Sequence, residues 1–360
     1  MARDGTVRET AEEVARFAAD YKALREALGR VIVGQEDAVR GTLLCLFAGG
    51  HLLLEGVPGT GKTLLVRTLA KAVNLTFGRV QCTPDLMPAD VLGTWMIHEE
   101  DGKRTFGFRH GPVFANILLA DEVNRATPKT QSALLEAMEE RQVTAGSDTF
   151  PLPRPFVLLA TQNPIEMEGT FPLPEAQMDR FLLKALVSSP SVEEIETILE
   201  RTTTETLPQA PTVLDGERVL AMQALARQVP LGDRARNWIA RLVHATRPDT
   251  DGSVDLARRY LRYGASARAA QALALCGKVL ALADGRAAVW HGGQGHGWMG
   301  RIGTATGVVV IPAAGPQIPG YDSEISSNDV RRPPGRPLHP GVPAGGLRRR
   351  RGPHLSLIHI

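Results

Sequence analysis

Along residues 1–190, helical spacing of apolar side chains gives way repeatedly to short, continuous apolar runs. An amphipathic helix is predicted near the start of the chain by Val7, Val14, Phe17, Tyr21, Leu24 and Leu28. Further helices are predicted over residues 36–49 and from Lys62 onward. Strands are predicted over residues 51–55, 77–82, 116–121, 156–161 and 181–187, and the first of them is a short apolar run that ends in a glycine-rich segment. Apolar strands separated by helices are typical of a parallel sheet covered on both faces, so the fold class is α/β.

The pattern changes twice beyond this α/β part. From residue 191 to residue 286 the spacing is helical only, which predicts an all-α domain. Residues 287–360 contain 14 Gly and 9 Pro among 74 positions, and a packed core is not easily built from that composition. We therefore expect three parts, a core over 1–190, a helical domain over 191–286 and an irregular tail over 287–360.

The charge of the chain is unevenly spread between these parts. The tail has 8 Arg, no Lys and 3 acidic residues, a net charge of +5, which leaves −3 for residues 1–286. Three interpretations of the tail stay open. It is a basic segment that binds nucleic acid or acidic surfaces, a solvated disordered segment, or non-native sequence, since the final SLIHI resembles translated read-through of a sequencing adapter. We expect it to be disordered or non-native.

Composition narrows the class of protein. Hydrophobic residues make up 43% and charged residues 22%, which excludes disorder as the dominant state. No apolar run reaches 18 residues, and the charged first residues lack the apolar core of a secretory signal. Cys45, Cys82 and Cys276 have no metal-ligand spacing and are expected to be reduced thiols. We expect a cytoplasmic protein with no membrane span.

The strongest chemical signal is a phosphate-binding loop between a predicted strand and a predicted helix. The pattern G-x-x-x-x-G-K-[ST] is met by Gly56, Val57, Pro58, Gly59, Thr60, Gly61, Lys62 and Thr63. Its backbone N–H groups and the helix N-terminus attract phosphate oxygens. We expect Lys62 to reach the β- and γ-phosphates, Thr63 to hold Mg²⁺, and Leu64 to line the nucleotide.

Two acids end the third predicted strand. Asp121 is placed to hold Mg²⁺ beside Thr63, and Glu122 to polarise the water that attacks the γ-phosphate. Taken alone, the pair could equally be a solvated acidic strand end.

Two further polar residues follow later strands. Asn163 comes after the fourth strand, where it could orient the attacking water or sense the γ-phosphate, or simply form an Asn-Pro turn. Arg180 precedes the fifth strand. It could act as an arginine finger on a neighbouring subunit, or form a surface salt bridge.

Taken together, these stretches resemble the MoxR family of AAA+ ATPases. The resemblance runs from about Val7 to Arg286. It is carried by VIVGQE at 31–36, GVPGTGKT at 56–63, the stretches 118–143 and 158–181, and GASARA at 264–269.

The resemblance implies a P-loop NTPase core followed by a helical lid. It makes Lys62 and Thr63 Walker A residues, Asp121 and Glu122 Walker B residues and Asn163 sensor 1. It places Arg180 at the arginine-finger position. Two further nucleotide contacts follow, from Gln35 in the segment 31–35 and from Arg268 in the sensor 2 motif, where Ala267 replaces the family's usual Pro. Residues 93–109 and 141–152 resemble elements with which family members grip a client.

The family assignment implies Mg²⁺-dependent hydrolysis of ATP by a ring, expected to be a hexamer, that remodels or matures protein complexes in a chaperone-like role. A partner with a von Willebrand factor A-type domain is also implied. One alternative is a nucleic-acid motor, which the −3 charge of residues 1–286 and the scarcity of Trp and Tyr disfavour. Another is a non-hydrolysing, nucleotide-dependent scaffold, which the presence of Glu122 disfavours. A small-molecule kinase is disfavoured because no acceptor-site motif is found.

Overall fold

The computed structural model describes residues 2–100, 103–164 and 169–289. Side chains are described for residues 10–97, 104–164 and 169–289. The predicted irregular tail therefore lies outside the described residues, except for residues 287–289.

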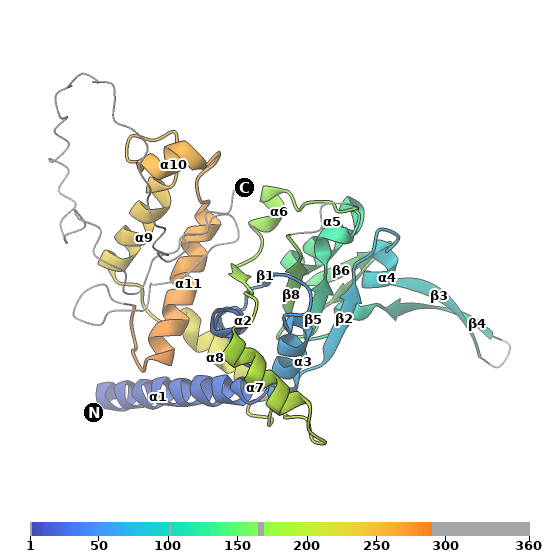
Figure 1. The fold of residues 1–360 in the computed structure, drawn as a ribbon, viewed down its shortest axis with the longest axis horizontal. Coiled ribbons are helices and arrows are strands. Elements are labelled where there is room, and N and C mark those ends of the chain that lie inside the picture. Colours follow the sequence, from blue (N-terminus) through green and yellow to red (C-terminus); the bar gives the residue numbers. More distant parts are fainter. Residues whose placement is uncertain (1, 101–102, 165–168, 290–360) are drawn as a thin grey trace, which may run out of the picture.

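A five-stranded parallel sheet forms the centre of the molecule (Figure 1). Its strands are β1 (Leu52–Glu55), β2 (Phe77–Gln81), β5 (Ile117–Asp121), β8 (Val157–Gln162) and β9 (Leu183–Leu186), in the order β2-β5-β8-β1-β9. Each neighbouring pair is parallel. The five predicted strands thus form this sheet, each within a few residues of its predicted bounds.

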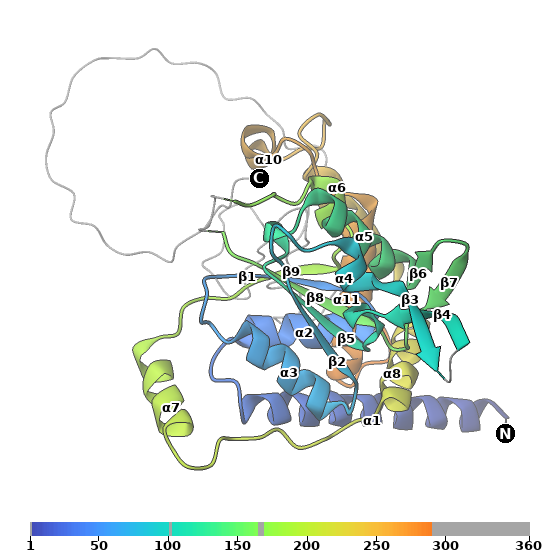
Figure 2. The same ribbon diagram turned by 90° about the vertical axis from the view of Figure 1, so that its right-hand side faces the viewer.

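Helices cover both faces of the sheet (Figure 2). On one face lie α1 (Ala2–Gly29), α2 (Glu36–Ala48) and α3 (Lys62–Ala72), and on the other lie α4 (Pro88–Leu92) and α5 (Pro128–Glu140). Alternate strand residues serve the two cores. Leu52 and Leu54 join the cluster with the first group of helices, whereas Leu53 joins the cluster with α4 and α5. Burial on both faces explains the continuous apolar runs of β1, β5 and β8, whereas β2, at the edge of the sheet, has only Val80 buried.

Two antiparallel hairpins extend from the core. The longer pairs β3 (Gly93–Glu100) with β4 (Lys103–His110) and projects from the body (Figure 1). The shorter pairs β6 (Gln142–Ala145) with β7 (Asp148–Pro151). They meet through Phe108 and Phe150, whose rings stack with centroids 4.3 Å apart. The two segments singled out by the family resemblance are therefore hairpins. Two 3-10 turns, η1 (Pro112–Phe114) and η2 (Val123–Arg125), and the short helix α6 (Glu175–Met178) complete the core.

The chain after the sheet is helical, as the spacing predicts. It comprises α7 (Val192–Thr202), α8 (Gly216–Gln228), α9 (Asp233–Ala245), α10 (Asp255–Tyr260) and α11 (Ala267–Ala283). Buried side chains of α8 and α11, including Met222 and Cys276, belong to the same hydrophobic cluster as α1 and α2. Within the described ranges, no helix combines the length and hydrophobicity needed to cross a bilayer. The α/β core followed by a helical region is confirmed, and the boundary at residue 190 stays a prediction.

Candidate nucleotide-binding site

The glycine-rich loop connects β1 directly to α3. Gly59 and Gly61 both have φ near +80°, a conformation that residues with a Cβ rarely adopt. Gly56 is required for a different reason, because a Cβ there would lie 2.5 Å from the carbonyl oxygen of Val187. These three glycines let the chain turn sharply from a buried strand into a helix, so the N-terminus of α3 faces the loop.

Lys62 is the first residue of α3 and folds back onto the loop. Its Nζ donates to the carbonyl oxygens of Gly56 at 2.8 Å and Val57 at 2.7 Å. Partial burial lowers the pKa of Lys62, while the negative charges of Asp121 and Glu122 act in the opposite direction. The ammonium group is therefore held within the glycine-rich loop and in the electric field of both acids.

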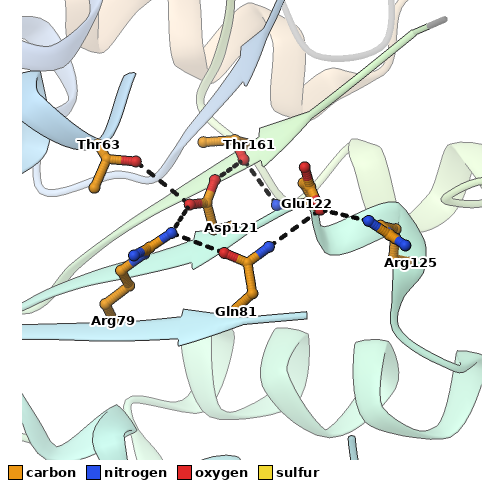
Figure 3. Close-up of polar contacts among 7 residues, drawn as sticks. All are labelled: Thr63, Arg79, Gln81, Asp121, Glu122, Arg125 and Thr161. Carbon is orange, nitrogen blue, oxygen red and sulfur yellow. Dashed lines mark hydrogen bonds and ion pairs between the residues drawn. The ribbon is translucent and has the colours of Figure 1, made fainter. Parts of the chain in front are cut away.

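Asp121 is the centre of a network that joins three strands and the loop (Figure 3). Its Oδ2 accepts from Thr63 Oγ1 at 3.3 Å and from Arg79 Nη2 at 2.7 Å. Its Oδ1 accepts from Thr161 Oγ1 at 2.6 Å. Thr63 and Asp121, predicted from the sequence as a pair, are in direct contact.

Glu122 follows in a left-handed conformation, with φ of 56°. Its backbone N–H donates to Thr161 Oγ1 at 2.8 Å. Its carboxylate Oε2 accepts from Gln81 Nε2 and from Arg125 Nη1, both at 3.1 Å (Figure 3). A left-handed non-glycine residue is typical of functional sites, and here the conformation redirects the chain after the strand. The carboxylate is held by two donors from different elements.

Four residues of this network were not predicted from the sequence: Arg79, Gln81, Arg125 and Thr161. A signal for two of them was present, because Arg79 and Gln81 stand two positions apart in a predicted strand and therefore share one face. Their register partners on β5 are Leu119 and Asp121, so both side chains lie on the same face of the sheet as Asp121.

Asn163 lies one residue beyond β8, at the same edge of the sheet as the two acids. Its side chain is buried, with 5% of the residue exposed. Its carbonyl oxygen accepts from Asn124 Nδ2 at 3.4 Å. The predicted position at the carboxyl ends of neighbouring parallel strands is therefore observed, and the role of Asn163 stays a prediction.

Gln35 and Leu64 flank the loop. Gln35 adopts φ of 55° just before α2, and its Nε2 donates to the carbonyl oxygen of Ser188 at 2.8 Å. This bond ties the segment 31–35 to the chain that leaves β9. Leu64, in the first turn of α3, is 47% exposed and available for contact with a ligand.

Arg180 and Arg268 form a second cluster. Arg180 Nη1 lies 3.1 Å from Glu139 Oε2, and Arg268 Nη2 lies 2.6 Å from Glu139 Oε1. The structure therefore contains the salt bridge that the sequence left open for Arg180. The predicted site residues Thr63 and Glu122 thus lie around Asp121, whereas Arg180 and Arg268 are bonded to Glu139. Helix α11 begins at Ala267, and its N-cap Ser266 accepts from the N–H of Ala269.

The residues present suit a nucleotide with Mg²⁺. Gly59 and Gly61 leave open space where a Cβ would stand, so nothing crowds the loop. Thr63 and Asp121 supply a hydroxyl and a carboxylate oxygen, the hard donors that Mg²⁺ prefers. Lys62 supplies a cation for phosphate oxygens. The arrangement can bind a phosphate chain, hold a cation beside it and present a carboxylate base.

Comparisons with known proteins point the same way. The ATPase family associated with various cellular activities (AAA) matches residues 51–183. Chaperone MoxR1 of Mycobacterium tuberculosis is 45% identical over 273 residues, covering 75% of this chain and 72% of that protein. Protein MoxR of Paracoccus denitrificans is 32% identical over 292 residues, covering 75% of this chain and 84% of that protein.

A solved structure is similar over most of the chain. The crystal structure of a candidate ATPase from Cytophaga hutchinsonii superposes with a TM-score of 0.73 at 40% sequence identity. The match covers 79% of this chain and 86% of that one, so it includes helices beyond the sheet as well as the nucleotide-binding core.

Proposed function

The chain belongs to the MoxR family of AAA+ ATPases and is an ATPase, and from that premise we propose that it hydrolyses ATP with Mg²⁺ in a ring of subunits and remodels protein clients. The observation that carries the proposal is the network around Asp121. The buried carboxylate of Asp121 accepts hydrogen bonds from Thr63, in the phosphate-binding loop, and from Thr161. Thr161 in turn accepts from the backbone N–H of Glu122, so the loop and both acids are connected.

In this proposal the loop binds the terminal phosphates of ATP. The backbone N–H groups at the N-terminus of α3 face phosphate oxygens, and the helix dipole adds partial positive charge. Lys62 exchanges its bonds to the Gly56 and Val57 carbonyl oxygens for bonds to phosphate oxygens. Gln35 and Leu64 contact the rest of the nucleotide. Thr63 and Asp121 would hold Mg²⁺, which would neutralise part of the charge of the phosphates.

Glu122 is the general base. Its carboxylate accepts a proton from the water that attacks the γ-phosphorus, and the bond to the β–γ bridging oxygen breaks to give ADP and phosphate. Gln81 and Arg125 hold the carboxylate in place through Oε2. Asn163, at the same edge of the sheet, orients the water or contacts the γ-phosphate.

Arg180 and Arg268 supply positive charge from outside the phosphate-binding loop. Arg180 is bonded to α5, through Glu139 and the carbonyl oxygen of Leu135 at 3.2 Å. We propose that it completes the site of a neighbouring subunit as an arginine finger, in a hexameric ring. Hydrolysis would then depend on assembly.

The client is proposed to be a protein, in a chaperone-like role in the cytoplasm. Support comes from the name of the relative called a chaperone and from the hairpins that extend from the core. A partner with a von Willebrand factor A-type domain is part of the same proposal.

The test is phosphate release by the full chain with MgATP over a wide range of protein concentration. Turnover per subunit is expected to rise with concentration. Glu122→Gln should bind ATP and release no phosphate. Arg180→Ala should bind ATP and lose the concentration-dependent turnover, whereas Arg236→Ala, on the exposed face of α9, should behave as the wild type. Turnover that is unchanged by Glu122→Gln would overturn the catalytic assignment, and turnover independent of concentration would overturn the shared site.

A further inference from the structure

Glu139 lies in the last turn of α5 and contacts two arginines that come from distant parts of the chain. Arg180 belongs to the segment between α6 and β9, and Arg268 to the first turn of α11. Each arginine takes a different carboxylate oxygen, at 3.1 Å on Oε2 and 2.6 Å on Oε1. One carboxylate thus bridges a core arginine and an arginine of the helical region.

We propose that Glu139 is a positioning residue that holds Arg180 and Arg268 as one unit, an inference that rests on the proposed function of both arginines in ATP hydrolysis. Two guanidinium groups would repel each other if brought together without an anion between them. With Glu139 between them the three side chains carry a net charge of +1 and the repulsion is offset.

A second bond beside the first supports this assignment. Ser266 Oγ donates to Asp179 Oδ1 at 2.7 Å. Asp179 precedes Arg180 by one residue, and Ser266 precedes Arg268 by two. Ser266 also caps α11, so the bond fixes the start of that helix against the end of α6. The two links together join the first turn of α11 to the end of α5 and to the segment that carries Arg180.

The exposure of Arg180, Glu139 and Arg268 indicates that their ion pairs affect the position of the two arginines more than the stability of the fold. The side chains of Arg180, Glu139 and Arg268 are 31%, 37% and 47% exposed. Ion pairs at that exposure contribute little to folding because water and salt screen them. The same exposure leaves both guanidinium groups accessible from outside the subunit. In this proposal Glu139 acts by holding the two cations next to each other.

The test compares Glu139→Gln with Glu140→Gln in the full chain. Both remove one negative charge, and Glu140 is the adjacent, exposed last residue of α5. Because a glutamine amide has only one oxygen to offer two arginines, Glu139→Gln is expected to lower kcat by about fivefold and to leave KM for ATP within about twofold. Glu139→Asp should restore part of kcat, and Glu140→Gln should match the wild type.

A second measurement reports the bridge without hydrolysis. Amide hydrogen exchange in the first turns of α11 should be faster in Glu139→Gln than in the wild type and in Glu140→Gln. Equal exchange in all three proteins, or equal kcat in the two glutamine variants, would overturn the inference. If the wild-type chain released no phosphate, the proposed function would fail, and the exchange measurement would still decide whether Glu139 holds the two parts together.

Discussion

Thr161 Oγ1 lies 2.6 Å from Asp121 Oδ1 and bridges the two acids at the end of β5. The hydroxyl donates to the carboxylate of Asp121 and accepts from the backbone N–H of Glu122 at 2.8 Å. Thr161 is fully buried, in the strand next to β5. One side chain therefore fixes the orientation of the proposed metal ligand and the backbone that carries the proposed base.

Replacing Thr161 by valine should keep the shape of the side chain and remove both hydrogen bonds. We expect kcat to fall by at least about tenfold, as for other residues that orient a metal ligand, with ATP affinity nearly unchanged. Thr42→Val is the matched control, because Thr42 is equally buried but bonds only within α2. Phosphate release gives kcat and nucleotide titration gives the affinity for ATP of both variants. Equal kcat values would show that the Thr161 bridge has no catalytic consequence.

Arg79 and a divalent cation would compete for the same oxygen. Arg79 Nη2 lies 2.7 Å from Asp121 Oδ2, which Thr63 also contacts. The arginine side chain is 48% exposed, so the ion pair contributes at most about 1 kcal/mol. Arg79→Ala should therefore lower the Mg²⁺ concentration that gives half-maximal ATP binding by about twofold to fivefold. The measurement is a Mg²⁺ titration of ATP binding, with Arg67→Ala on the exposed face of α3 as the control. An increased requirement for Mg²⁺ would show that Arg79 supports the metal site.

Local patterns were sufficient to predict the sheet and the phosphate-binding loop. Short apolar runs next to turn residues indicated β1, β5 and β8, which are buried on both faces. The loop is a contiguous motif whose glycines are needed for backbone reasons at Gly59 and Gly61. The pairing of Thr63 with Asp121 was predicted because an acid at the end of a buried strand, following a phosphate-binding loop, is typical of a site for Mg²⁺.

Contacts that depend on register between strands were not predictable in the same way. Glu55 and Lys184 are each 7% exposed and form an ion pair of 2.8 Å between β1 and β9, although both stand in apolar runs. Gln81 meets Glu122 only because β2 pairs with β5 in one register. The bridge at Glu139 needed the first turn of α11 to lie beside the last turn of α5, which no periodicity in either helix specifies.

Lys62→Ala tests the loop directly. The ammonium group is the one side-chain cation within the glycine-rich motif, and a charge-assisted bond to phosphate is among the stronger hydrogen bonds. We expect ATP affinity to fall by about 100-fold, to the limit of detection by calorimetry. Lys71→Ala, in the last turn of the same helix and exposed, should bind ATP as the wild type does. Full affinity in Lys62→Ala would place the nucleotide elsewhere.

His51 gives the fold a dependence on pH that is separate from the site. The imidazole is buried beside β8, and its Nδ1 accepts from the N–H of Leu158 at 3.0 Å. Burial, with a smaller contribution from the positive charge of Arg141, lowers the pKa of His51 from 6.5 to about 3. At a pH between those two values the imidazole of His51 is protonated in the unfolded chain but neutral in the folded protein. The free energy of unfolding therefore falls as the pH falls.

That sign leads to a measurable difference between the wild type and His51→Asn, in which the amide oxygen can still accept from Leu158. Between pH 7.5 and pH 5.5 the wild type should lose about 1.4 kcal/mol of unfolding free energy through this one histidine. The asparagine variant should lack that loss while sharing every contribution from carboxylates. Urea unfolding of both proteins at the two pH values isolates the effect. The change in unfolding free energy between the two pH values is compared in the two proteins, and contributions from the groups that they share cancel. Parallel pH dependence in the two proteins would mean that His51 titrates alike in the folded and unfolded states, against the burial seen in the structure.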